Sequence, residues 1–451
     1  MEYVENHQKL TKEQKQAVGI LSIGTFLEYF DLMLYVHMAV LLNDIFFSKT
    51  DTFSSQLLSA FSFSVTYVFR PLGGYFIGNL GDRIGRKYTI MFTSVAMSIT
   101  CLIMTFLPTY DQVGIIASWA VTLCRIVQGI SSMGEKVGAQ LYLTETIKPP
   151  LVYPAVASTN ITDAAGGVFA LIIANLSLSY YFNWRVAFFA GSIIAFVGLF
   201  ARRTLRETRD FADANKQINK MSKDYYIDKK EIYDKPWMKD KISKKLVVAF
   251  FFLTTPYPVF FYMIYFYCSQ NFFNNQPQEI IQHNTIILLI ELIIASGICY
   301  LSYFVNPFKI LKVKFFAFLC LLPFLIYLFN LVSSVYELIL FQTTILLLLP
   351  TTNPAYPIIY KSFPILKRFT TACLTYAIAR AVMYVVSSFG ITILTNKYGS
   401  LGLIILLIPV SLLYGWGLFT FIKYHNETIE SGDSSNKKLL PKDDLLTIET
   451  A

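Results

Sequence analysis

The chain of 451 residues is poor in charge, and its potential metal-binding and disulfide-forming residues are scattered. Only 15% of its residues are charged, against roughly 25% in a typical soluble domain. The six cysteines lie within apolar runs without paired or metal-ligand spacing, and the four histidines form no cluster. These absences argue against a soluble domain, a metal centre and an enzyme. We expect no cofactor, and we expect the cysteines to behave as small buried apolar residues.

Residues 1–16 are polar and mixed in charge, so they lack the basic-then-apolar layout of a cleaved signal peptide. What the chain has instead is apolar runs, since 55% of it is hydrophobic and its mean hydropathy is +0.50. Runs of about 20 apolar residues predict membrane-spanning helices. Twelve are predicted: 17–43, 54–80, 88–107, 113–143, 154–180, 184–203, 246–272, 281–304, 313–332, 336–360, 369–394 and 400–424.

The expected fold is therefore an all-α integral membrane protein, with twelve transmembrane helices in two six-helix bundles. Its predicted divisions are a cytoplasmic N-terminal segment (1–16), an N-terminal bundle (17–203), a cytoplasmic linker (204–245), a C-terminal bundle (246–424) and a disordered cytoplasmic tail (425–451).

Basic residues are distributed unevenly between the two sides that this topology defines. With the N-terminus inside, the inside segments carry 31 of the 38 lysines and arginines, and the outside segments carry three. This bias predicts that both termini are cytoplasmic. Residues 202–245 contain fourteen basic and eight acidic residues, which indicates a solvated linker beside an anionic leaflet. We expect no nucleic-acid partner, because the charge follows the topology.

The stretch RPLGGYFIGNLGDRIGRK (70–87) ends an apolar run with a cluster of glycine and charge. Glycines remove side chains where backbones approach closely or turn. Asp82 can accept from exposed backbone amides or lie near a positive helix end, and the basic residues would lie in the headgroup layer. We interpret the cluster as a latch between helices. Its members are Gly78, Gly81, Asp82, Arg83, Gly85, Arg86 and Lys87.

This cluster resembles the loop between helices 2 and 3 of the major facilitator superfamily of transporters. More narrowly, the chain is similar to the metabolite:proton symporter family, which includes proline/betaine, citrate, 2-oxoglutarate and shikimate permeases. Five segments of the N-terminal half carry the resemblance. They are FLEYFDLMLY (26–35), FRPLGG (69–74), RIVQGISSMGE (125–135), NWRVAFFAG (183–191) and RRTLRET (202–208). The resemblance implies the major facilitator fold.

The C-terminal half resembles this family less closely. FPILKR (363–368) matches the pattern before helix 11, but YFVNPFKILKVK (303–314) has no glycine, aspartate or arginine where the second copy of the latch motif belongs. The second half therefore departs from the family pattern at the segment where its own latch motif would form a gate. The osmosensing members carry a long C-terminal coiled coil, whereas this tail is short and has no heptads.

Ionisable residues at membrane depth are functional candidates by default because they are costly there. On the first span, Glu28, Asp31 and Tyr35 fall on one helical stripe. Such a carboxylate pair can hold a shared proton at neutral pH for coupled transport, since burial and mutual repulsion favour the neutral form. Alternatively, arginines from neighbouring helices fix them as ion pairs.

On the fourth span, Arg125, Gln128 and Glu135 share one sector of the helix. Arg125 can bind a substrate carboxylate bidentately or pair with an acid of the first span. Lys136, where the family has an aromatic or apolar residue, can neutralise Glu135.

The other intramembrane candidates are spread over both halves of the chain. Arg70 suits a structural ion pair or a substrate contact, and Asn160 and Asp163 share a face suited to lining a cavity. Glu291 and Arg380 can pair with each other, or Arg380 can face the cavity. Arg380 has no counterpart in the family pattern, which makes it a candidate for altered substrate choice.

Together these features predict a secondary active transporter. We expect proton-coupled symport of a small carboxylate-bearing solute, of the proline/betaine type or an organic acid, by alternating access. We expect a proton as the coupling ion, the solute and the lipid bilayer as partners, and a functional monomer in a bacterial inner membrane with both termini cytoplasmic. The alternative is a substrate sensor of the same fold that no longer transports.

Overall fold

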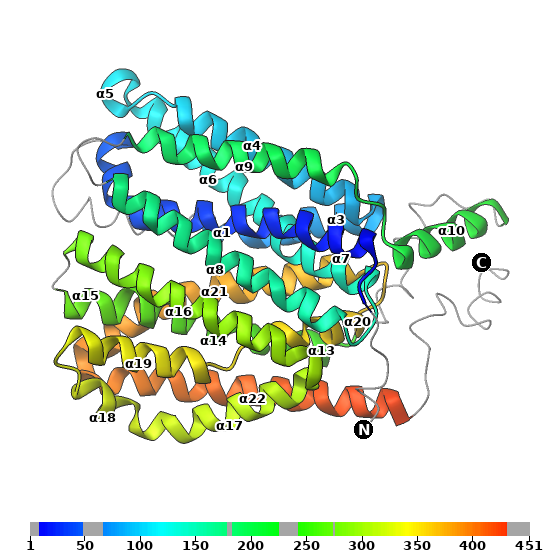
Figure 1. Ribbon diagram of the computed structural model, residues 1–451. Coiled ribbons are helices and arrows are strands. Elements are labelled where there is room, and N and C mark those ends of the chain that lie inside the picture. Colours follow the sequence, from blue (N-terminus) through cyan, green and yellow to red (C-terminus); the bar gives the residue numbers. More distant parts are fainter. Residues whose placement is uncertain (1–8, 48–65, 178–182, 225–241, 274–275, 431–451) are drawn as a thin grey trace.

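The computed structural model describes residues 9–47, 66–177, 183–224, 242–273 and 276–430, and these residues form helices without any strand (Figure 1). The helices of the N-terminal half are α1 (Lys12–Phe46), α3 (Arg70–Ile84), α4 (Arg86–Phe106), α5 (Tyr110–Val113), α6 (Ile115–Met133), η1 (Gly134–Gly138), α7 (Ala139–Thr146), α8 (Val152–Ser177) and α9 (Trp184–Arg202). After α10 (Arg209–Asp224), the C-terminal half contains α13 (Lys244–Thr254), α14 (Pro256–Tyr262), η2 (Met263–Cys268), α15 (Ser269–Phe272), α16 (Pro277–Phe304), α17 (Pro307–Leu321), η3 (Leu322–Phe324), α18 (Leu325–Asn330), α19 (Val335–Leu348), η4 (Asn353–Ala355), α20 (Tyr356–Lys361), α21 (Arg368–Tyr398) and α22 (Leu401–Glu430).

The predicted spans coincide with these helices. In the part of the chain that the structure describes, 11 helices are long and apolar enough to cross a membrane. The remaining prediction, 54–80, ends in α3, and most of its first part lies outside the described residues. Helix α22 continues to Glu430, into the segment predicted as a disordered tail, and 431–451 lie outside the described residues.

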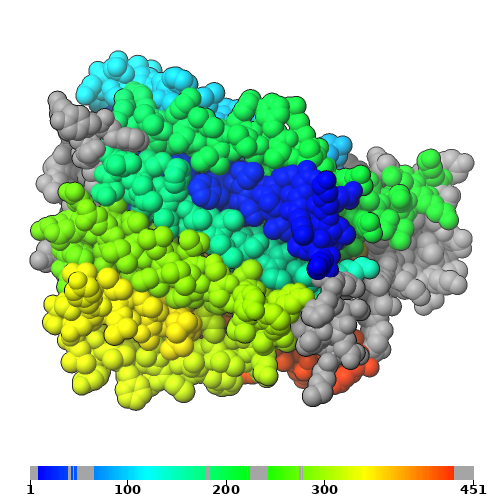
Figure 2. Space-filling view, in the orientation of Figure 1, coloured from blue at the N-terminus to red at the C-terminus, as the bar shows by residue number. Residues whose placement is uncertain are grey.

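The two halves lie one above the other in Figure 1, with their long helices running in similar directions. Helices α8 and α16 meet across the boundary, and Figure 2 shows the two halves in contact along them. Large apolar side chains, among them Phe76, Phe92, Trp119 and Ile293, are exposed on the outside of the molecule. A helical bundle with an apolar exterior and internally bonded backbones suits a bilayer.

The second contact between the halves is the crossing of α3 and α21. A Cβ added at Gly78 would lie 2.6 Å from the Cα of Thr370, and one added at Gly74 would lie 2.9 Å from the Cα of Leu374. Glycine is therefore required on α3, because any side chain would meet the backbone of α21. Gly74 and Gly78 therefore allow the two halves to touch.

Two expectations from the sequence need correction here. The predicted linker contains α10, whose buried Phe211, Ala214 and Ile218 show that it packs on the protein as an amphipathic helix; residues 225–241 lie outside the described residues. The six cysteines are all free, but Cys320 is exposed and Cys299 is partly exposed. A lipid-facing surface accepts the same apolar residues as the interior, so an apolar run does not tell which side a cysteine faces.

Candidate functional site

A polar cavity lies between the two halves, at the level where α1 and α8 face α14, α16, α17 and α21. Its lining carries three acidic and four basic side chains together with tyrosines of both halves. The charged residues are Glu28, Asp163, Glu291, Arg70, Lys136, Lys314 and Arg380. The tyrosines are Tyr29, Tyr257, Tyr376 and Tyr384.

The two acids of the first span have separate arginine partners. Glu28 accepts from Arg70 Nη2 at 2.8 Å at the wall of the cavity. Asp31 accepts from Arg125 Nη1 at 2.8 Å, away from the residues that line the cavity. A shared proton between these two carboxylates is therefore not what the structure shows, because each is held by a guanidinium of another helix.

The Asp31 cluster is internally complete. Gln128 Nε2 donates to Asp31 Oδ1 at 2.9 Å, and Arg125 donates to Gln128 Oε1 at 2.7 Å. The Arg125 guanidinium also lies 4.0 Å from the centre of the Tyr35 ring, a cation–π contact. Of the two roles predicted for Arg125, the structure shows the ion pair with the first span.

Glu135 and Lys136 point to different places, and Lys136 does not neutralise Glu135. Glu135 is fully buried and accepts from Arg202 at 2.6 and 2.8 Å. Lys136 instead forms an ion pair with Asp163 at the cavity and lies 3.4 Å from Asn160 Oδ1. Consecutive helical residues point about 100° apart, so neighbours in sequence serve different clusters. The pair lies in the π-turn η1, a local geometry often found at functional sites.

Arg380 is the cation of the cavity with the least compensation. Its side chain is 6% exposed, and its guanidinium lies 4.2 Å from the Tyr257 ring centre and 4.8 Å from that of Tyr376. Its Nε and Nη1 have no hydrogen-bond partner, and within the described ranges no carboxylate lies at ion-pair distance. Arg380 and Glu291 therefore do not pair with each other.

Lys314 is a cavity residue that the sequence did not predict, and Glu291 is a predicted residue with an unpredicted partner. Lys314 lines the cavity from α17, and its Nζ lies 3.4 Å from Thr351 Oγ1. The predicted span begins at residue 313, so Lys314 is grouped with the loop lysines. Helix α17 in fact begins at Pro307, which places Lys314 within the helix. Glu291 accepts from the Tyr265 hydroxyl at 2.5 Å. Among the tyrosines of the seventh span, Tyr257 lines the cavity, and Tyr265 reaches it through Glu291.

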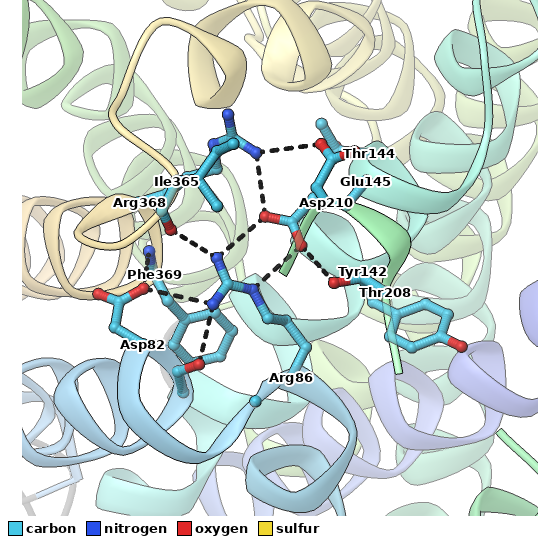
Figure 3. Close-up of polar contacts among 12 residues, drawn as sticks. Asp82, Arg86, Tyr142, Thr144, Glu145, Thr208, Asp210, Ile365, Arg368 and Phe369 are labelled. Carbon is cyan, nitrogen blue, oxygen red and sulfur yellow. Dashed lines mark hydrogen bonds and ion pairs between the residues drawn. The ribbon is translucent and has the colours of Figure 1, made fainter. Parts of the chain in front are cut away.

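The latch motif joins the two halves at one end of the bundle (Figure 3). Asp82 accepts from the backbone amides of Phe369 at 3.1 Å and Thr370 at 2.8 Å, and from the Thr370 hydroxyl at 2.7 Å. These amides belong to the first turn of α21, whose unpaired N–H groups and positive dipole end favour a carboxylate. The sequence predicted this kind of contact for Asp82 but not its partner helix.

Arg86 lies at the centre of the latch and is fully buried, so its guanidinium faces protein partners. It donates to both oxygens of Glu145 at 3.0 Å and to the carbonyl of Ile365 at 2.8 Å (Figure 3). Glu145 also accepts from Arg368 at 3.0 Å. Glu145 thus compensates two arginines, one from each half, and no sequence motif pointed to it.

The rest of the motif shapes the turn. Gly85 has φ +107°, a conformation that favours glycine, and Phe369 packs against Gly81. Glu207 accepts from the backbone amides of Arg86 and Lys87 at 2.9 and 3.2 Å. Burial raises the pKa of Glu207.

The two remaining basic residues of the motif, Lys87 and Arg83, differ in their surroundings. Lys87 donates to the carbonyl of Arg203 at 3.2 Å, whereas Arg83 is exposed. At the matching place in the second half, Phe308 packs edge-on against His425 at 5.6 Å.

The helix order and the cavity between two halves define a multi-pass membrane protein of the major facilitator fold. The fold is similar to a solved proton:xylose symporter of that superfamily (TM-score 0.70, 12% identity, 91% of this chain and 96% of the other). It is also similar to the human organic anion transporter MFSD10 (TM-score 0.65, 14% identity, 91% and 100% covered). The model of the sugar (and other) transporter family matches residues 17–276, and the chain belongs to this family.

Relatives with curated names match a little under half of the chain. A putative metabolite transport protein of Haemophilus influenzae is 35% identical over 208 residues, which cover 44% of this chain and 46% of the relative. The proline/betaine transporter of Escherichia coli K12 is 32% identical over 205 residues, covering 44% and 41%. The chain thus spans about half the length of the curated relatives it matches.

Proposed function

We propose that this protein is a secondary active transporter that carries a small carboxylate-bearing solute by proton-coupled symport. The family and the fold support a carrier, and the cavity between the halves supplies a binding place that either side of the membrane can reach in turn. The distribution of lysine and arginine supports an orientation with both termini in the cytoplasm.

The observation that carries the proposal is the uncompensated guanidinium of Arg380. A buried charge without a partner is costly, and its unpaired Nε and Nη1 donors add to that cost. A carboxylate satisfies both the charge and a pair of parallel donors. The tyrosine rings beside Arg380 hold the cation in place until such a ligand arrives.

The charge of the cavity favours an acidic or zwitterionic solute over a neutral sugar. Glu28 and Asp163 are already paired with Arg70 and Lys136. Arg380 and Lys314 remain without an ion-pair partner in the described residues, against the single carboxylate of Glu291. A neutral solute would leave the excess positive charge of Arg380 and Lys314 uncompensated.

The latch supports alternating access. In this structure Asp82, Arg86 and Glu145 tie α3 and α7 to α21 and to the segment before it, so the two halves are joined at that end. Transport requires these contacts to break as the halves rock apart at the latch.

The test is uptake into proteoliposomes with an inward proton gradient. The panel consists of proline, betaine, citrate, 2-oxoglutarate, succinate and shikimate, with xylose as the neutral control. Gradient-dependent accumulation of one carboxylate, and none of xylose, is the expected result. If no compound accumulates and none shows counterflow, while the pure protein still binds one of them, the chain is a sensor and the transport proposal is wrong.

A further inference from the structure

We infer that Glu291 on α16 binds the transported proton, and that the substrate anion and the proton are coupled through their charges inside one cavity. This inference rests on the proposed function. It differs from the sequence hypothesis, which assigns the proton to Glu28 or Asp31 of the first span.

The ion pairs of the cavity single out Glu291. Glu28 bonds to Arg70 at 2.8 Å, and Asp163 pairs with Lys136. Glu291 is half-buried, lines the cavity and bonds to the Tyr265 hydroxyl. It is the cavity carboxylate without a basic partner at ion-pair distance among the described residues.

A carboxylate that pairs with a buried arginine can take up a proton only if that arginine gains another counter-charge. Protonating Glu28 or Asp31 would leave Arg70 or Arg125 as an uncompensated buried cation, which is strongly unfavourable. Protonating Glu291 leaves no such partner behind. Because Glu291 has no ion pair to break among the described residues, it can bind and release a proton in each transport cycle.

The groups around Glu291 provide the coupling. Lys136 from η1 and Lys314 from α17 line the same cavity as Glu291, and nearby positive charges favour the ionised form of a carboxylate. The remaining charged or titratable groups lining the same cavity are Glu28 and Tyr29 on α1, Arg70 on α3, Asp163 on α8, Tyr257 on α14, and Tyr376, Arg380 and Tyr384 on α21. Tyr265 on η2 is the group in direct hydrogen-bond contact with it.

A bound substrate carboxylate changes this balance. It neutralises the positive charge of Arg380 and Lys314 and adds a negative charge beside Glu291, so the protonated form of Glu291 becomes favoured. By thermodynamic reciprocity, a proton on Glu291 then strengthens substrate binding by the same factor. Coupling of this kind typically amounts to about 5- to 150-fold. Substrate and proton therefore bind and leave together, as symport requires.

The test compares Glu291→Gln with Glu279→Gln in proteoliposomes. Glu279 lies exposed in the first turn of the same helix, outside the cavity, and serves as the matched control. Two assays are run with the solute that the uptake panel identifies: accumulation driven by a proton gradient, and counterflow of labelled solute at equal pH on both sides. E291Q should lose accumulation and keep counterflow, and E279Q should match the unsubstituted protein in both.

A binding measurement supplies an independent readout. Substrate affinity of the unsubstituted protein should rise by about 5-fold or more as the pH falls, and that of E291Q should not change with pH. Gradient-driven accumulation by E291Q, or loss of counterflow in folded E291Q, would overturn the inference. If E28Q or D31N, and not E291Q, lost accumulation and kept counterflow, the proton site would be Glu28 or Asp31 of the first span. Failure of the unsubstituted protein in both assays would instead reject the proposed function.

Discussion

At the scale of single residues, what matters is which buried charge has a partner. Asp31 and Arg125 form a complete cluster with Gln128 and Tyr35, whereas Arg380 lies among tyrosine rings without a carboxylate in the described part of the chain. The first arrangement stabilises the N-terminal bundle. The second costs stability and is explained by a ligand, because functional sites are where a fold keeps unfavourable groups.

Asp31→Asn should destabilise the protein by about 3–5 kcal/mol, because it leaves the Arg125 guanidinium buried without its counter-charge. Thermal unfolding in detergent measures this. The control is Asp111→Asn, at an exposed position, which should stay within about 0.5 kcal/mol of the unsubstituted protein. Adding Arg125→Met to D31N should recover part of the loss. An unchanged melting temperature for D31N would show that the pair contributes nothing.

Arg380→Gln should raise the KM for uptake by at least about 30-fold, the equivalent of losing roughly 2 kcal/mol of a buried charge pair. Arg380→Lys should lose less, since it keeps the charge but not the two parallel donors. The melting temperature of R380Q should not fall, because the substitution removes an uncompensated charge. Arg203→Gln, at an exposed arginine, is the matched control. A drop in stability without a change in KM would assign Arg380 a structural role.

At the scale of elements, the crossing of α3 and α21 is the contact that depends most on small residues. Gly78 lies where an added Cβ would be 2.6 Å from the Cα of Thr370. Close by, Asp82 bonds to the Phe369 and Thr370 amides. Separation of the two helices at Gly78 would therefore also weaken the latch.

Gly78→Ala should increase hydrogen exchange at the amides of Phe369 and Thr370, because α21 must move away from the new methyl group and from Asp82. Hydrogen–deuterium exchange of a peptide that contains the start of α21 measures this. The control is Gly297→Ala on α16, where an added Cβ meets nothing within 4 Å. Equal exchange in G78A and G297A would mean that the crossing accommodates the methyl group without moving.

At the scale of the whole molecule, the latch links the two halves through one carboxylate. Glu145 of the N-terminal half bonds to Arg86 and to Arg368, which begins α21. Glu145 and Arg86 belong to the same half, whereas Arg368 belongs to the other. When the latch opens, Glu145 therefore loses its bond to Arg368 and keeps its bond to Arg86. Substitution of Glu145 should therefore shift the equilibrium between the closed and the open latch.

Glu145→Gln should open the latch end, because the closed state would then bury two arginines without a shared counter-charge. A single cysteine placed at Asn160, a cavity-lining position, in a background without the native cysteines, reports this through an impermeant maleimide. Labelling from the latch side should increase in E145Q. Glu13→Gln removes an exposed ion pair with Arg206 and should leave labelling unchanged. Equal labelling in both variants would show that the latch does not control access.

Much of the fold was predictable, since each span is a local property of about 20 residues and the latch motif is contiguous in sequence. The site was less predictable. Lys314 and Arg202 counted as loop residues because they lie at span boundaries. The helices place Lys314 in the cavity that Glu291 also lines, and Arg202 against Glu135. Glu145 carried no motif at all, and its role follows from its position between two arginines.

The sequence by itself determined the helices, their order and the glycine positions that let α3 approach another helix. Hydropathy and backbone conformation depend on neighbours along the chain, so they can be read there. Only the tertiary structure decided which acid meets which base: Glu28 with Arg70, Asp31 with Arg125, Glu135 with Arg202, and Glu145 with both Arg86 and Arg368. These pairs depend on the rotation and depth of packed helices, which no single helix specifies. For the same reason, only the packed structure shows that Arg380 and Glu291 face the cavity without an ionic partner among the described residues.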